Sequence, residues 1–170
     1  EGPQQVLKWM QPKIDFQNVI GIDEVGRGSL FGPVFAGAVI LNTSAEKLLI
    51  SVGLKDSKKL SSRQRNLLVP LIQKHADDYG IGQASNKEID ESGIRHATEL
   101  AMIRALDHIA DRQGIILVDG ILPIKLWEGP QKTLKKGDSL CPAIAAASVI
   151  AKVARDDLIT KIAQEFPGYG

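Results

Sequence analysis

The stretch Val19-Ile20-Gly21-Ile22-Asp23-Glu24-Val25-Gly26-Arg27-Gly28 contains the features on which the predicted fold depends. Its first half is a short apolar run of the kind that forms a buried strand, and the run ends in two adjacent carboxylates. Its second half is rich in glycine, which favours a tight turn, and a second apolar run follows from Val34 to Leu41. The pattern therefore predicts two strands joined by a turn-rich connection.

Three further strands are expected downstream. Tyr79 to Ala84 is a weaker strand candidate, and a short edge strand is expected near Thr133 to Lys136. Ile115 to Val118 is a continuous apolar run that closes on Asp119 and Gly120, as in a central strand that is buried on both faces.

Three helices are expected between and after these strands. One is expected from Ser62 to about Asp78, kinked or shortened by Pro70. A capping box at Ser85 to Glu88 precedes a second, amphipathic helix from about Ser92 to Arg112. Pro142 fits the first turn of a third helix, which runs from Ala143 to about Glu165. Strands that alternate with helices predict an α/β domain with a mixed sheet.

Length and composition restrict the class of protein. A chain of 170 residues with a formal net charge of +1 fits one globular domain, and nucleic-acid contact then requires a local basic surface. The single cysteine, Cys141, excludes an intrachain disulfide and a cysteine-rich zinc site, as in a reducing compartment. There is no apolar run of membrane-spanning length and no leader peptide. We therefore expect a cytoplasmic protein, with residues 1–17 as an N-terminal extension or processing remnant.

Carboxylates follow two of the predicted strands, Asp23 and Glu24 after the first and Asp119 after the fourth. If these strands are adjacent and parallel, the three acids meet at the sheet edge where open α/β sheets bind ligands. A loop could add Asp138 as a fourth. Clustered acids without imidazole or thiolate favour Mg²⁺ or Mn²⁺, and two such ions suit phosphoryl transfer. Each acid taken alone is more often a solvated turn residue.

Basic residues near the acids admit two interpretations. Arg27 between Gly26 and Gly28 suits phosphate contact or a simple tight connection. The segment from Lys55 to Arg63 suits phosphates or a solvated loop, and solvation is the preferred interpretation for Lys59 and Arg65. Lys152 and Arg155 are one helical turn apart beside Asp156, which suits a phosphate or an internal salt bridge. His75, His96 and His108 share no ligand-like spacing and are expected to be surface or packing residues.

Five motifs occur in an order that resembles bacterial ribonuclease HII, the type 2 ribonuclease H. They are Gly21 to Gly28, Asp56 to Leu60, Val118 to Gly120, Lys136 to Ser139, and Ala145 to Asp156. The resemblance extends from about Val19 to Tyr169. It implies a ribonuclease H-like fold with a five-stranded mixed sheet flanked by helices.

The implied activity is endonucleolytic cleavage of RNA in RNA–DNA hybrids and nicking 5′ to single ribonucleotides in duplex DNA, which leaves a 3′-OH and a 5′-phosphate. Such an enzyme serves ribonucleotide removal in replication and repair. Within the resemblance, Asp23, Glu24, Asp119 and Asp138 match the catalytic acids that bind two Mg²⁺ or Mn²⁺ ions.

Other matching positions imply substrate contacts. Gly26-Arg27-Gly28 matches the segment that senses the 2′-OH, the group that distinguishes RNA from DNA. Substrate contacts are also expected from Lys58, Ser139 and Lys152. The family continues into a His-Lys-Gly-Tyr segment that residues 18–170 lack, so we expect a monomeric catalytic domain without its C-terminal tail, and Tyr169 does not take the role of that tyrosine.

Three alternatives are less favoured. The related type 3 enzymes carry Lys at the position of Arg27 and an extra N-terminal domain, which the 18 residues before Val19 could not form. A non-catalytic binding module would have at least one substituted acid. A general metal-dependent phosphatase would not need so many basic residues around its acids.

Overall fold

The chain is described here from a computed structural model, in which residues 19–29, 32–54 and 57–166 are placed. The predicted extension 1–17, Lys55 and Asp56 of the basic segment, and Tyr169 lie outside these residues. The five strands form one sheet in the order β3-β2-β1-β4-β5. Their bounds are β1 Ile20–Val25, β2 Val34–Ile40, β3 Asp78–Ala84, β4 Ile116–Asp119 and β5 Gln131–Leu134.

The sheet is mixed, as the alternation of strands and helices predicts. β1 pairs antiparallel with β2, and β2 pairs antiparallel with β3. β4 lies between β1 and β5 and is parallel to both, which confirms it as an interior strand. β5 is the predicted edge strand, and it begins two residues earlier than expected.

The helices confirm the predicted pattern in part. Their bounds are α2 Thr43–Ser51, the 3₁₀ helix η1 Ser57–Lys59, α3 Ser62–His75, α4 Asn86–Ser92, α5 Ile94–Leu106, α6 Gly137–Leu140 and α7 Pro142–Glu165. Pro142 occupies the first turn of α7, and Ser85 and Glu88 form the predicted capping box at the start of α4. Sequence reasoning missed α2, η1 and α6.

Two helix predictions were wrong in length. α3 continues through Pro70 to His75, because Pro70 is exposed while Leu68 and Ile72 on either side of it are buried in the core. α5 ends at Leu106 rather than Arg112. Asp78 accepts a hydrogen bond from the Ala110 N–H at 2.9 Å, so the chain turns back toward β3 beyond the helix.

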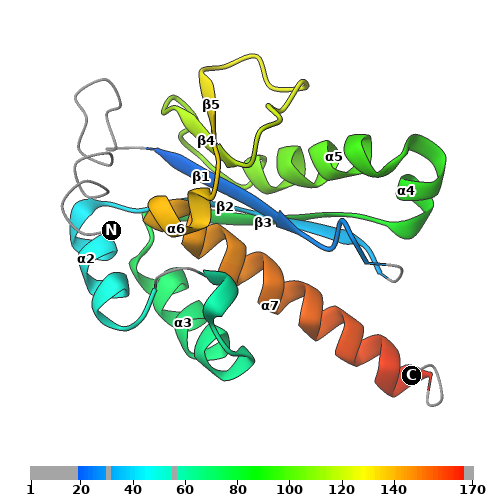
Figure 1. Cartoon of the computed structure of the whole chain (residues 1–170), viewed down its shortest axis with the longest axis horizontal. Coiled ribbons are helices and arrows are strands. Elements are labelled where there is room, and N and C mark those ends of the chain that lie inside the picture. The colour runs from blue at the N-terminus through cyan, green and yellow to red at the C-terminus, as the bar shows by residue number, and fades with distance from the viewer. Residues whose placement is uncertain (1–18, 30–31, 55–56, 167–170) are drawn as a thin grey trace.

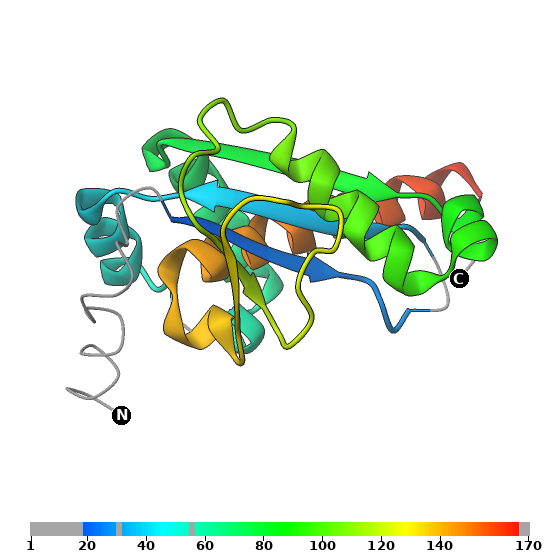
Figure 2. The same ribbon diagram turned by 90° about the horizontal axis from the view of Figure 1, so that it is seen from above.

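Helices cover both faces of the sheet in three layers (Figures 1 and 2). α7 crosses one face together with α2 and α3, and α5 lies on the other face. Successive residues of a strand point to opposite faces. Accordingly, Val39 and Leu117 pack in the core on the α7 side, whereas Ile22 and Val118 pack with Met102 of α5 on the other.

Glycines in the strands allow the helices to approach the sheet backbone closely. A Cβ on Gly37 would lie 2.3 Å from the Ala147 carbonyl oxygen of α7, and one on Gly21 would lie 2.4 Å from the Ala143 carbonyl carbon. On the opposite face, a Cβ on Gly82 would lie 2.2 Å from the Ala101 oxygen of α5. The sheet edge that holds the predicted acids is therefore fixed directly against α7.

Candidate active site

The two neighbouring parallel strands bring the predicted acids together. Ile22 of β1 is in register with Val118 of β4, so Asp23 and Asp119 follow at the same carboxyl-end edge of the sheet. By strand alternation both lie on the α7 face, and Glu24 lies on the α5 face. This arrangement confirms that the two strands are adjacent and parallel, as the sequence interpretation required.

Asp23 lies at the electrostatic centre of the acids. It is 4% exposed, and burial is the largest cause that raises the pKa of its carboxyl well above the usual value. The negative charges of Asp119, Glu24 and Asp138 raise this pKa further, while the Glu24 N–H, which donates to Asp23 Oδ1 at 2.8 Å, lowers it. A buried carboxylate surrounded by others is costly unless a cation binds there, and such groups cluster at functional sites.

Glu24 is held between acids and bases. Burial is the largest cause that raises the pKa of its carboxyl, and the charge of Asp119 adds to this. The positive charges of Arg27 and Lys58 lower the pKa of the same carboxyl. Arg27 and Lys58 are therefore close enough to the acids to act on a ligand bound there.

Hydrogen bonds orient the other two carboxylates. Asp119 Oδ1 accepts the Gly137 N–H at 2.7 Å, which ties the end of β4 to the start of α6. Asp138 is buried in α6, and its Oδ2 accepts the Ser57 hydroxyl at 3.0 Å. The fourth acid is therefore presented by a short helix rather than by the predicted loop, and η1 holds it in place.

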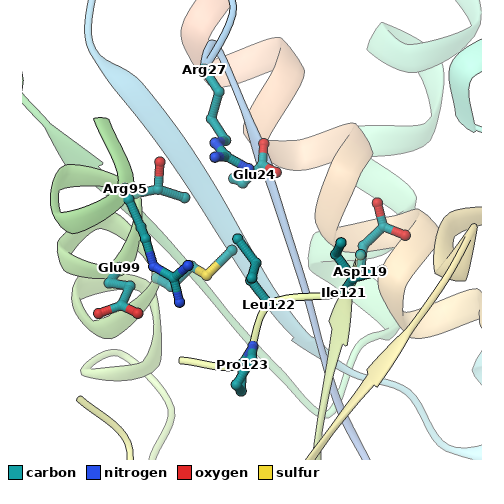
Figure 3. A pocket seen from close by; sticks show the side chains of 11 residues that line it. Glu24, Arg27, Arg95, Glu99, Asp119, Ile121, Leu122 and Pro123 are labelled. Atoms are coloured by element: carbon teal, nitrogen blue, oxygen red, sulfur yellow. The ribbon is translucent and has the colours of Figure 1, made fainter. Parts of the chain in front are cut away.

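Three recesses meet at these acids. The first lies toward α7 and is lined by the three acids Asp23, Glu24 and Asp119 and by the polar residues Ser57, Lys58, Arg65, Ser148 and Lys152. The second lies along Gly26-Arg27-Gly28 and also reaches Lys152. The third, which we call the α5 pocket, lies between α5 and the chain after β4 (Figure 3). Glu24 belongs to all three, so the recesses are continuous around the acids.

Comparison with known proteins is consistent with this geometry. The ribonuclease HII family model matches residues 20–170. The ribonuclease HII of Prochlorococcus marinus is 60% identical over 150 residues, which cover 88% of this chain and 78% of that protein. The chain belongs to the ribonuclease HII family. The protein is therefore a ribonuclease H, an endoribonuclease that acts on RNA–DNA hybrids.

Solved structures support the same fold. The ribonuclease H2 from Pyrococcus horikoshii superposes with a TM-score of 0.78 at 31% identity, covering 89% of this chain and 78% of that one. A type 3 enzyme, Bst-RNase HIII in complex with Mn²⁺, superposes with a TM-score of 0.72 at 22% identity, covering 86% of this chain and 54% of that one. The predicted ribonuclease H-like fold with its five-stranded mixed sheet is thus confirmed.

The prediction that Arg65 is a solvated loop residue was wrong. Its side chain is only 15% exposed, so it is not a solvated loop residue. Its Nη1 donates to the Leu60 carbonyl at 2.6 Å, and its Nη2 lies 3.9 Å from Asp156 Oδ2. Asp156 also pairs with Lys152 at 3.1 Å. Arg65 and Asp156 thus connect the segment carrying Lys58 to the helix carrying Lys152.

The glycine-rich turn also has a structural role. Gly26 has φ +97°, and a Cβ there would meet Arg155 Nε at 2.6 Å. Arg155 is buried and donates from Nε to the Pro33 carbonyl at 3.1 Å, so it packs beneath the turn instead of reaching the recesses. Of the two cations considered on α7, Lys152 lines the site, and its salt bridge with Asp156 is the predicted internal one.

Ser139 is the candidate that the fold does not bring into a recess. Its hydroxyl donates to the Lys136 carbonyl at 2.8 Å, and it lines none of the three recesses above. Its predicted substrate contact stays a prediction. His75 is half-buried, and His96 and His108 are exposed, consistent with surface or packing roles.

Some residues of the site were missed. Ser57 and Ser148 lie inside the motifs quoted above, and only the fold shows that both line the recess with Asp23. Arg95 of α5 lines the α5 pocket but lies in none of those motifs. A single arginine at the start of a helix is common, so the sequence did not single it out. No helix in the described part of this ribonuclease HII has the length and apolar character needed to cross a bilayer.

The donor chemistry fits a hard divalent ion. All four acids offer carboxylate oxygens, and none of them forms a salt bridge within the described residues. Across residues 19–29, 32–54 and 57–166, however, no three potential ligand side chains converge into a ready-made metal site. Asp119 and Asp138 are instead directed toward Gly137 and Ser57. Each of these hydrogen bonds occupies one carboxylate oxygen, so Asp119 Oδ2 and Asp138 Oδ1 make neither of the two bonds.

Proposed function

We propose that this protein nicks duplex DNA on the 5′ side of a single embedded ribonucleotide, in addition to its action on RNA–DNA hybrids, and that both reactions require Mg²⁺ or Mn²⁺. The observation that supports metal dependence is the buried Asp23, whose pKa is raised by burial and by three neighbouring carboxylates. A divalent cation reverses this unfavourable electrostatic situation. The type 3 neighbour solved with Mn²⁺ is consistent with the choice of ion.

Asp23, Glu24, Asp119 and Asp138 would hold the ion or ions. When bound, two such ions lower the pKa of a water and neutralise the charge that develops on the phosphate during in-line displacement. The protein's own contribution is placement. β1 and β4 fix two of the acids through the sheet, and α6 and η1 fix the fourth through the Ser57 hydrogen bond. The products expected are a 3′-OH and a 5′-phosphate.

Basic residues around the acids would bind the substrate backbone. Lys58 and Lys152 line the recess toward α7, and Arg27 and Lys152 line the recess along the glycine-rich turn. Several cations around one site suit a chain of phosphates better than a single small ester. This distribution favours a nuclease over a general phosphatase.

Gly26-Arg27-Gly28 would recognise the ribose. Gly28 has no heavy atom within 4 Å of the position of a Cβ, so its backbone is open to a ligand. Arg27 is exposed and adjacent to Glu24, where it can reach a phosphate or hydroxyl next to the acids. A 2′-OH at that point is the feature by which a single ribonucleotide is distinguished from DNA. Residues 18–170 would form one catalytic domain that acts as a monomer.

The test is cleavage of three labelled duplexes: a DNA duplex with one ribonucleotide, the same duplex made only of DNA, and a long RNA–DNA hybrid. Each is incubated with Mg²⁺, with Mn²⁺ or with chelator, and the ends are mapped. We expect a nick 5′ to the ribonucleotide with either ion and none with chelator or with all-DNA duplex. Cleavage in chelator would contradict metal dependence. Cleavage of long hybrids without nicking at the single ribonucleotide would contradict the junction activity alone.

A further inference from the structure

The α5 pocket contains charged and apolar groups to which the chemistry at the acids gives no role. Glu24 and Asp119 form its boundary with the catalytic acids. Beyond them, the guanidinium groups of Arg27 and Arg95 enter from the end of β1 and from α5 (Figure 3). The wall opposite α5 is formed by the chain after β4, where Ile121 is 67% exposed and Leu122 is 40% exposed.

Arg95 is free to bind a ligand. It is half-buried at the start of α5, and it makes no hydrogen bond or ion pair with the described residues. Figure 3 shows its side chain extending from the helix toward Leu122 and Pro123, across the pocket. Arg104 on the same helix is different, because it makes two short hydrogen bonds to the Glu88 carboxylate. An unpaired guanidinium beside a recess is well suited to a phosphate.

The carboxylate of Glu99 opposes the positive charge of Arg95. It lies one helical turn after Arg95, is 7% exposed, and lines the same pocket. Its Oε1 accepts the Lys125 N–H at 3.1 Å, so the carboxylate is held in the wall by the chain after β4. A negative charge in this position weakens the attraction of Arg95 for an anion.

We propose that the α5 pocket binds a nucleotide of the substrate that flanks the scissile phosphate, with Arg95 on its phosphate and Ile121 and Leu122 against its sugar. This inference rests on the proposed function, because it requires a polynucleotide bound at the acids. A strand whose scissile phosphate lies at Glu24 and Asp119 continues to both sides. The basic recess toward α7 accommodates one side, and the α5 pocket accommodates the other.

The lining of the pocket also suits an amphipathic ligand. Two exposed aliphatic side chains next to a guanidinium match a nucleotide, which has an apolar sugar face beside a charged phosphate. A phosphate alone would make no use of Ile121 and Leu122. Arg95 is thus a substrate-positioning residue outside the acids and the glycine-rich turn.

The test compares Arg95→Ala with Arg112→Ala, a matched loss of one exposed arginine beyond the far end of α5. Binding to an RNA–DNA hybrid is measured in chelator over a range of salt concentrations. We expect Arg95→Ala to weaken binding about tenfold, as for a lost charged hydrogen bond. The slope of log K against log salt should become shallower by about 0.9, corresponding to one phosphate. Arg112→Ala should match the wild type in both.

A second arm assigns the subsite. The wild type and Arg95→Ala cleave a DNA strand that contains a short ribonucleotide tract, annealed to DNA and trimmed stepwise from either side. The effect of Arg95→Ala on kcat/KM should disappear when the substrate is trimmed on one side of the scissile phosphate, and it should remain when the other side is trimmed. An effect that persists on every trimmed substrate, or no difference between Arg95→Ala and Arg112→Ala, would overturn the proposal. If the wild type cleaves nothing, the proposed function itself fails.

A variant that is expected to tighten binding keeps the proposal testable if Arg95→Ala misfolds. Glu99→Gln keeps the oxygen that accepts the Lys125 N–H and removes the opposing charge. It should bind the hybrid more tightly, by severalfold, with an unchanged melting temperature. Unchanged or weaker binding by Glu99→Gln would overturn the proposal even if Arg95→Ala does not fold.

Discussion

At the scale of single residues, Asp23 is a buried carboxylate that is costly to ionise in the folded protein. Burial and three neighbouring carboxylates raise its pKa, so the folded protein holds an unfavourable charge when no cation is bound. Its neighbours provide one N–H, from Glu24, as partial compensation. A buried carboxylate with such a cost is more typical of a functional site than of a purely structural position.

The substitution Asp23→Asn should therefore separate activity from stability. It removes a ligand charge with little change in volume, so cleavage of an RNA–DNA hybrid should fall at least about 100-fold. In chelator the variant should melt at the same temperature as the wild type or higher, because the buried charge is gone. Calorimetry and a cleavage assay check both parts. Retained cleavage would exclude Asp23 from the metal site.

Arg27 gives the opposite test, because its proposed role is confined to binding the substrate. Because it is exposed, Arg27→Ala should change the free energy of unfolding by less than about 0.5 kcal/mol. The KM for a duplex with one ribonucleotide should rise about tenfold, as for one lost charged contact. A large loss of stability with normal cleavage would instead assign Arg27 a structural role in the turn.

At the scale of elements, the close contact of α7 with the sheet determines where the acids lie. Gly37 of β2 is paired with Asp23 of β1 and faces the Ala147 carbonyl of α7. Gly37→Ala would place a Cβ 2.3 Å from that oxygen. We expect a loss of about 3 kcal/mol of stability by denaturant titration, because backbone must move. Gly28→Ala, which meets no atom within 4 Å, is the matched control and should leave stability unchanged.

The link between α3 and α7 gives a second test at this scale. Asp156 pairs with Lys152 at 3.1 Å and with Arg65 at 3.9 Å, and both partners line the recess at the acids. Asp156→Asn should raise KM severalfold with little change in kcat, since it releases two cations that face the substrate. The free energy of unfolding should change by less than about 1 kcal/mol, because the pair is partly exposed. Asp156→Glu should restore most of the KM, and a fall in kcat alone would contradict this role.

The same elements show what could be predicted from sequence. β1, β2 and α7 have strong local signals, an apolar run or a long alanine-rich segment after a proline, and all three were predicted to within a few residues. α6 has only four residues, and its Lys136 adopts a positive φ of 54°, so nothing local indicates a helix. Just beyond the end of α5, the Ala110 N–H donates a hydrogen bond to Asp78, which precedes it by many residues. Tertiary contacts of this kind leave no local pattern.

The site divides in the same way. Asp23, Glu24 and Asp119 could be predicted to meet, because the carboxyl ends of adjacent parallel strands share one edge. Asp138 was predicted to join the other acids from a loop. In the structure it lies in the short helix α6, where the Ser57 hydroxyl donates a hydrogen bond to it. Arg65 and Arg95 became visible only in three dimensions, since their importance depends on Asp156 and on the chain after β4.

At the scale of the whole molecule, the acids connect parts of the chain that are distant in sequence. A divalent ion shared by β1, β4 and α6 should therefore stabilise the fold as a unit. At 100 times its Kd, Mg²⁺ or Mn²⁺ should add about 2.7 kcal/mol, or roughly 5–10 °C in Tm. Asp119→Asn should reduce this increase, and Asp90→Asn on α4 should not. An equal increase for all three proteins would indicate non-specific binding of the ion.

The separation of the acids along the chain also bears on protein synthesis. Domains fold from the N-terminus as the ribosome extends the chain, and β1 with Asp23 and Glu24 emerges long before β4. Asp119, Asp138 and Lys152 are added only afterwards. A nascent chain that holds the first two acids has no partner strand to complete the cluster, so the growing polypeptide cannot yet bring the four acids together. The order of the strands therefore delays assembly of the acid cluster until β4 and α6 have been made.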